Sequence, residues 1–80
     1  MDIVVGSVVT AKAGRDKGSL FAVLKIDDKG FAYIADGKSR KIEKPKKKNL
    51  RHLQPTSAAL TENLDTNRKL KQALSNFNKS

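Results

Sequence analysis

Residues 20–35 read LFAVLKIDDKGFAYIA, two short apolar runs on either side of a turn. Leu20–Ile26 and Phe31–Ala35 contain β-branched and aromatic residues, and the Asp, Lys and Gly between them are typical of a chain reversal. The pattern predicts two neighbouring antiparallel strands. Leu20–Leu24 is apolar at odd and even positions alike, so the sequence leaves open which face of that strand points inward.

Short apolar runs continue this pattern toward both ends of the chain. The further predicted strands are Val4–Lys12, Arg40–Glu43 and Leu50–Leu53, and the segments between them, including Lys44–Asn49, are predicted as connections. Five strands within about fifty residues predict a mainly β fold, a small closed five-stranded barrel. Closure would remove unpaired edges, and lysines near the edges would oppose the addition of another chain.

The pattern changes near Pro55, which has no backbone N–H and is expected to end the strand region. We therefore predict a barrel domain at residues 1–55 and a C-terminal extension at residues 56–80. Whether residues 56–64 are helical is left open.

Apolar residues in the extension recur at intervals of three and four, which predicts an amphipathic α-helix at about residues 65–78. Asp65 or Thr66 is expected to cap its start. The apolar stripe is expected to pack on the barrel, and it consists of Leu70, Ala73, Leu74 and Phe77.

The chain has 80 residues, of which 38% are hydrophobic and 5% aromatic, so one small domain with an appendage is the upper limit. A core of this size leaves little room for a substrate cavity, and we expect neither an enzyme nor a small-molecule substrate. Lys and Arg number 17 against 8 Asp and Glu, a formal net charge of +9. A partner with dense negative charge is expected.

The absence of cysteine excludes a disulfide framework, a thiolate metal site and a cysteine nucleophile. No metal or other cofactor is expected. The first residues carry no basic stretch and no apolar run long enough for a signal peptide or a membrane span. The cytoplasm is the expected location, without a membrane partner.

Basic residues are densest between Lys38 and Arg51, where Glu43 is the only acidic residue. The basic residues are Lys38, Arg40, Lys41, Lys44, Lys46, Lys47, Lys48 and Arg51. Because like charges held close together repel, such a cluster favours a polyanion whose counterions are released on binding. The alternative is a flexible, solvated lysine loop. We favour a binding surface because predicted strands flank the cluster.

Gly14 and Gly18 enclose a charged loop, Arg15-Asp16-Lys17, between two predicted strands. Glycine tolerates a positive φ and lets a phosphate approach the backbone closely. The loop is not a nucleotide-hydrolysing phosphate loop, because the spacing to a Gly-Lys-Ser/Thr motif and the following helix are both missing.

Four segments in order resemble the KOW-domain RNA-binding proteins, and the resemblance covers roughly residues 5 to 56. The segments are Gly6-Ser7-Val8-Val9, Ala13-Gly14-Arg15-Asp16-Lys17-Gly18, Asp36-Gly37-Lys38-Ser39-Arg40 and Pro45-Lys46-Lys47-Lys48-Asn49-Leu50-Arg51-His52-Leu53. More narrowly, the chain is similar to small bacterial relatives of a KOW-type large-subunit ribosomal protein of archaea and eukaryotes. The resemblance implies an SH3-like barrel, RNA as partner and a ribosomal setting.

Charge and resemblance together give one set of predicted RNA-binding residues, with Gly14 and Gly18 as structural loop glycines. The set is Lys12, Arg15, Lys17, Lys38, Arg40, Lys41, Lys44, Lys46, Lys47, Lys48, Asn49, Arg51 and His52. Arginine can bind a phosphate through two hydrogen bonds and stack on a base, so the arginines are expected to make specific contacts and the lysines to supply affinity.

We expect mainly structural roles for the single histidine and the few aromatic residues. His52 cannot form a histidine cluster within one chain and is expected to pack or stack at the barrel rim. Phe21, Phe31, Tyr33 and Phe77 are expected to be mainly buried, with Tyr33 the best candidate for exposure and base stacking.

The sequence thus predicts a non-catalytic RNA-binding protein that contacts large-subunit ribosomal RNA, with ribosomal proteins as further candidate partners. A second interpretation is a protein-interaction module of the translation or transcription machinery that uses the barrel and the C-terminal helix. A third is general DNA binding through the same charges.

Overall fold

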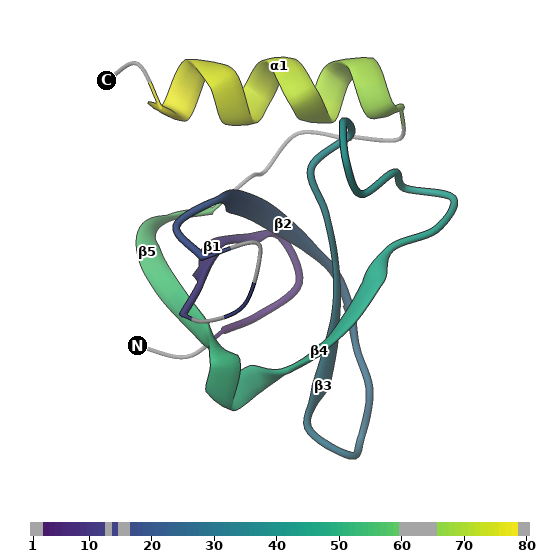
Figure 1. The fold of residues 1–80 in the computed structure, drawn as a ribbon, viewed down its shortest axis with the longest axis vertical. Helices are drawn as coiled ribbons and strands as arrows, with labels where there is room; N and C mark the ends of the chain where they lie inside the picture. Colours follow the sequence, from purple (N-terminus) through teal and green to yellow (C-terminus); the bar gives the residue numbers. More distant parts are fainter. Residues whose placement is uncertain (1–2, 13, 15–16, 60–65, 79–80) are drawn as a thin grey trace.

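The computed structural model describes residues 3–12, 14, 17–59 and 66–78. Within these residues the elements are β1 (Ser7–Ala11), β2 (Leu20–Ile26), β3 (Phe31–Ala35), β4 (Lys46–Asn49), a 3-10 turn (Leu50–His52), β5 (Leu53–Ala59) and α1 (Asn67–Asn78). The strands form one antiparallel sheet in the order β4-β3-β2-β1-β5. The sheet curls into a half-barrel, and α1 lies across one end of it (Figure 1). The predicted fold, a small SH3-like β-barrel followed by a C-terminal helix, is confirmed.

β2 is apolar on both faces because both faces are buried. Phe21 and Val23 point into the barrel core, where they pack with Ile34 and Leu53. Ala22 belongs to a second cluster on the outside of the sheet, made with Val8, Ala35, Leu70 and Leu74. This answers the question that the sequence left open for Leu20–Leu24: Phe21 and Val23 face inward, and Leu20, Ala22 and Leu24 lie on the side of α1.

α1 begins two residues later than the predicted start at 65 and ends at the predicted residue. Thr66 caps it, since its Oγ1 accepts a hydrogen bond from the N–H of Lys69 at 3.2 Å. Leu70 and Leu74 are buried against the outside of the sheet, so the predicted packing of the apolar stripe on the barrel is confirmed for these two residues. Asp65 and the side chain of Phe77 lie outside the described part.

One predicted strand and one predicted connection are wrong. Arg40–Glu43 lies in the loop between β3 and β4, whereas part of the predicted connection, Lys46–Asn49, is β4 itself. Alternating residues at 40–43 resemble a strand, but hydrogen bonds to the Asp36 and Asn67 side chains hold the backbone in turns. β4 is an edge strand that pairs with β3 on one side. Lysines are common on edge strands, where they oppose pairing with another chain.

The predicted fifth strand is displaced for a related reason. Leu50–His52 forms the 3-10 turn, capped by Asn49, and β5 begins only at Leu53. β5 then continues through Pro55 to Ala59, so the strand region does not end at Pro55. A proline fits there because β5 is the other edge of the sheet and pairs only with β1. Beyond the proline, the Thr56 hydroxyl donates a hydrogen bond to the Val8 carbonyl at 2.7 Å.

In the part of the chain that the structure describes, no hydrogen-bonded ladder joins the two end strands of the barrel. Within the described residues, β4 and β5 stand at the two ends of the strand order, and the 3-10 turn joins them. The predicted closure is therefore wrong in this respect. Of the two end strands, β4 is the one that carries the lysines.

Candidate nucleic-acid interface

The lysine run is displayed on an ordered strand. Lys46, Lys47, Lys48 and Asn49 pair with Ile34, Tyr33, Ala32 and Phe31 of β3, in that order. Residues that pair across antiparallel strands share a face of the sheet. Lys47 is exposed on the outer face beside Tyr33, while Lys46 and Lys48 stem from the side of Ile34 and Ala32 and are half-buried. The positive charges of β4 are thus divided between the two faces.

Lys48, one of the two lysines on the inner side of β4, lies beside the first glycine loop. The Nζ of Lys48 lies 3.8 Å from the position that a Cβ atom on Gly14 would occupy. Gly14 has a φ of +88°, and its carbonyl accepts the N–H of Lys17 at 3.2 Å. Two segments that the sequence predicted separately are therefore in contact. Arg15, the predicted arginine of this loop, lies outside the described residues.

The loop between β3 and β4 is held in shape by Asp36. Its Oδ1 accepts hydrogen bonds from the N–H groups of Lys38 and Arg40, both at 2.8 Å. The N–H of Asp36 donates in turn to the Arg40 carbonyl at 2.9 Å. Lys38, Lys41 and Lys44 are exposed on this framework, and Arg40 is half-buried. The backbone that carries the basic residues of the loop consequently has a fixed shape.

Asn67, the first residue of α1, holds the far part of the same loop. Its Oδ1 accepts the N–H of Ile42 at 2.7 Å, and its Nδ2 donates to the Glu43 carboxylate at 2.8 and 3.0 Å. These hydrogen bonds from the Asn67 side chain lower the pKa of Glu43 below its ordinary value. Glu43 is therefore ionised at neutral pH, and its charge is used to fix the loop to α1.

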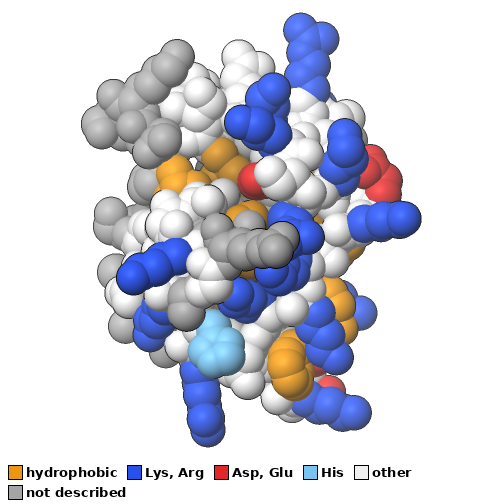
Figure 2. Space-filling model, viewed as in Figure 1, with side chains coloured by type: hydrophobic (Ala, Val, Ile, Leu, Met, Phe, Trp, Pro, Cys, Tyr) orange, Lys and Arg blue, Asp and Glu red, His pale blue; other side chains and the backbone are white. Residues whose placement is uncertain are grey.

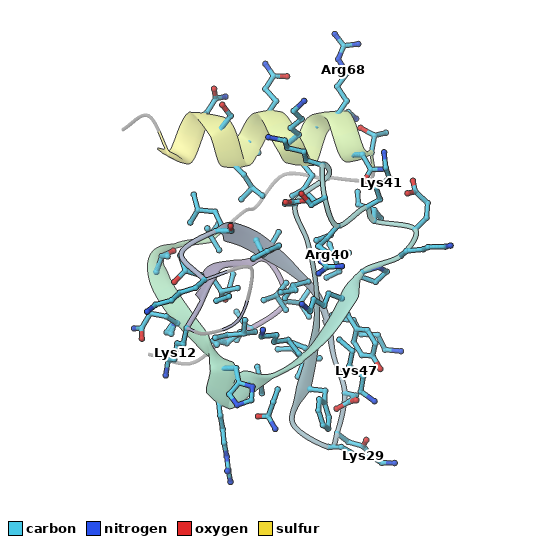
Figure 3. The ribbon with its side chains drawn as sticks, in the orientation of Figure 1. Lys12, Lys29, Arg40, Lys41, Lys47 and Arg68 are labelled. Atoms are coloured by element: carbon cyan, nitrogen blue, oxygen red, sulfur yellow. The ribbon has the colours of Figure 1, made fainter. Side chains whose placement is uncertain are left out.

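Lys12, Arg51 and His52 form a separate group at the other end of β4. The N–H of Lys12 donates to the His52 carbonyl at 2.9 Å, and all three side chains are exposed. The His52 ring is at the surface and does not pack in the barrel, so its role in stacking at the barrel rim stays a prediction. In Figure 3, Lys12 lies on the side of the barrel opposite Lys47. The predicted residues wrap around the barrel rather than forming one flat face.

An open groove of about 470 Å³ lies where α1 meets the barrel. Gly18 and Ser19 line one side of it, Asp36 and Lys38 another, and Lys71 comes from α1. The groove therefore connects the first glycine loop with the start of the basic loop. Figure 2 shows Lys and Arg side chains widely distributed over one face, with few acidic side chains among them.

The sequence prediction missed Lys25, which lies beside an aromatic ring. The Nζ of Lys25 is 5.7 Å from the centre of the Tyr33 ring, and the Nζ of Lys47 is 4.6 Å from the centre of the Phe31 ring. Phe31 and Tyr33 are half-buried, whereas Phe21 is fully buried as predicted. The sequence signal that was not used is the spacing of Phe31 and Tyr33. Residues two apart on a strand share a face, so this spacing predicts that the two rings lie on the same side of β3.

Asp27 fixes the turn that carries Lys29. Its Oδ1 accepts the N–H groups of Lys29 and Phe31 at 2.9 and 3.0 Å. The hydrogen bond from Phe31 lowers the pKa of Asp27, and the positive charges of Lys47 and Lys29 act in the same direction. The backbone at the start of β3, which carries Phe31, is thereby held in place.

Two further observations concern metals and membranes. In the part of the chain that the structure describes, no three His, Asp or Glu side chains are grouped so as to hold a metal ion. None of the described helices is long and apolar enough to cross a membrane.

Comparison with known proteins does not assign the chain to a family. No protein-family model matches it, and a search of curated proteins finds no match.

Proposed function

We propose that this protein binds RNA without catalysing a reaction, and that it acts in the cytoplasm. The phosphate backbone lies along β4 and the adjoining β3–β4 loop, where lysines supply charge, and reaches the first glycine loop beside Lys48. The observation that carries this proposal is that the lysine segment has a defined backbone structure. Its charges stand on a paired strand and on turns fixed by Asp36 and Asn67, which disfavours the alternative of a solvated flexible loop.

The RNA that we propose is the ribosomal RNA of the large subunit, with ribosomal proteins as neighbours. The support for this step is the resemblance of residues 5 to 56 to KOW-domain proteins, together with the SH3-like barrel. Crosslinking in cells by ultraviolet light, followed by sequencing of the attached RNA, tests it. Reads concentrated at one site of large-subunit RNA are expected, and reads scattered over many transcripts would contradict the ribosomal assignment.

The interpretation as a protein-interaction module is less well supported. It uses the barrel and the apolar stripe of the C-terminal helix, and Leu70 and Leu74 of that stripe are covered by the barrel. DNA binding uses the same charges as RNA binding. Competition between RNA and duplex DNA distinguishes them, and we expect RNA to be preferred.

The charges of β4 are tested by a pair of matched double variants. Lys47→Glu with Lys48→Glu changes β4, and Arg68→Glu with Lys69→Glu makes the same change in net charge on α1, where Arg68 points away from the barrel (Figure 3). If each lysine of β4 contacts a phosphate, the first variant should weaken RNA binding at least about tenfold. It should also reduce the slope of log affinity against log salt by about two.

The α1 variant is expected to change affinity far less, and circular dichroism confirms whether both variants are folded. Equal losses in the two variants would show that RNA responds only to total charge. The assignment of the phosphate path to β4 would then be wrong.

A further inference from the structure

Phe31 and Tyr33 form an aromatic pair on the outer face of β3. Their neighbours Ala32 and Ile34 point into the barrel core, so Phe31 and Tyr33 point outward, roughly 7 Å apart along the strand. Ala35 continues the same outward row and is buried in the cluster that packs on α1. The helix thus covers one end of the row and leaves the two rings partly exposed.

Ammonium groups flank both rings. The strand register places Tyr33 between Lys25 of β2 and Lys47 of β4. The Nζ of Lys25 is 5.7 Å from the Tyr33 ring centre, and the Nζ of Lys47 is 4.6 Å from the Phe31 ring centre. Both lysine side chains are exposed. A ring next to a positive charge is thereby presented twice on the outer face of β3.

We infer that this patch binds unpaired bases of single-stranded RNA, one stacked on Tyr33 and one on Phe31, with Lys25 and Lys47 pairing with the adjacent phosphates. This inference rests on the proposed RNA-binding function and names the form of RNA that it involves. Every base has a π-face, so such stacking does not depend on sequence. Bases in a duplex are stacked on one another and cannot reach the rings.

The lysines explain why a nucleotide fits this patch better than an apolar protein segment. An apolar partner on the rings would have to bury the ammonium groups of Lys25 and Lys47, which is unfavourable without a counter-charge. A nucleotide brings a flat base and a phosphate together. A cation over an exposed ring contributes only about 0.5–1 kcal/mol, so a lysine can leave the ring face for a phosphate when a base arrives.

The rings are also held by the backbone around them. Asp27 accepts a hydrogen bond from the Phe31 N–H, and the Asp27 N–H donates to the Phe31 carbonyl at 2.9 Å. Tyr33 lies on the central part of β3, which pairs on both sides. A preorganised ring loses little freedom when a base stacks on it.

The test compares a single-stranded oligoadenylate with an RNA duplex of the same length. Tyr33→Leu and Phe31→Leu remove a ring but keep an apolar side chain, and Tyr33→Phe keeps the ring. Each leucine variant should weaken oligoadenylate binding at least about fivefold, whereas Tyr33→Phe and duplex binding should stay close to the native values. Thermal unfolding monitored by circular dichroism shows that the variants are folded.

The chain supplies its own reporter for this contact. Tyr33 is the only tyrosine, and there is no tryptophan, so intrinsic fluorescence reports on this ring alone. Stacking of adenine on Tyr33 should quench the fluorescence of the native protein as oligoadenylate saturates it.

Two other results would overturn the inference in distinguishable ways. If the native protein binds both RNAs but the leucine variants bind oligoadenylate equally well and the fluorescence is unchanged, the stacking patch is wrong and RNA binding stands. If the native protein binds neither RNA at low salt, the proposed function is wrong, and the patch falls with it.

Discussion

Asn67 and Gly37 are two single residues that determine where the basic loop stands. Asn67 uses its side-chain amide to hold both Ile42 and Glu43. Gly37 has a φ of +77°, and a Cβ atom there would collide with the carbonyl oxygen of Asn67. The start of α1 therefore approaches the loop backbone too closely for any side chain at position 37.

Gly37→Ala should destabilise the protein more than an ordinary glycine replacement. The new methyl group combines positive-φ strain with a backbone collision, and we expect a loss of about 3 kcal/mol in the free energy of unfolding. Gly30→Ala is the matched control, because Gly30 has a φ of +89° with open space around it, and strain alone should cost about 1 kcal/mol. Urea unfolding measures both, and equal losses would mean that the contact with Asn67 does not matter.

At the scale of elements, the predicted strands are correct where burial decides them. Leu20–Ile26 and Phe31–Ala35 have the predicted bounds, because large apolar side chains there need a core. The errors occur where the backbone is fixed by distant partners. Neither the hydrogen bond from Ile42 to Asn67, 25 positions away, nor the pairing of Lys46–Asn49 with β3 is visible in local sequence.

The candidate site, too, could be predicted from local sequence only in part. Charge density and the resemblance identified the lysines of β4 and the loop. They did not identify Lys25, whose relevance comes from the register of β2, β3 and β4 around Tyr33. Nor did they show that Arg40 is half-buried, because its burial depends on the turn that Asp36 forms.

α1 is stabilised mainly by its contact with the sheet. It is a 12-residue helix, and isolated helices of this length are marginal in water. Leu70→Ala should therefore cost about 2–5 kcal/mol in the free energy of unfolding, and the loss of helix should be visible by circular dichroism. Gln72→Ala, on the exposed side of α1, should change stability by less than about 0.5 kcal/mol. Similar small effects for both variants would show that α1 does not depend on the sheet.

For the whole molecule, the excess of positive charge gives RNA binding a strong dependence on salt. If about five phosphates of single-stranded RNA are neutralised, a tenfold rise in salt should weaken binding by roughly three orders of magnitude. Fluorescence anisotropy of a labelled RNA across a salt series measures the slope. A flat response would show that charge does not drive the interaction, and the proposed phosphate path would have to be abandoned.

The double-sided burial of β2 constrains how relatives of this chain can vary. Leu20, Ala22 and Leu24 are apolar because α1 and the loop cover that side of the strand. A relative with the same barrel but without the helix would leave these positions in water, and polar residues could accumulate there while Phe21 and Val23 stayed apolar. The alternation of β2 in a related sequence would then reveal whether its barrel carries a helix, before any residue of the helix was read.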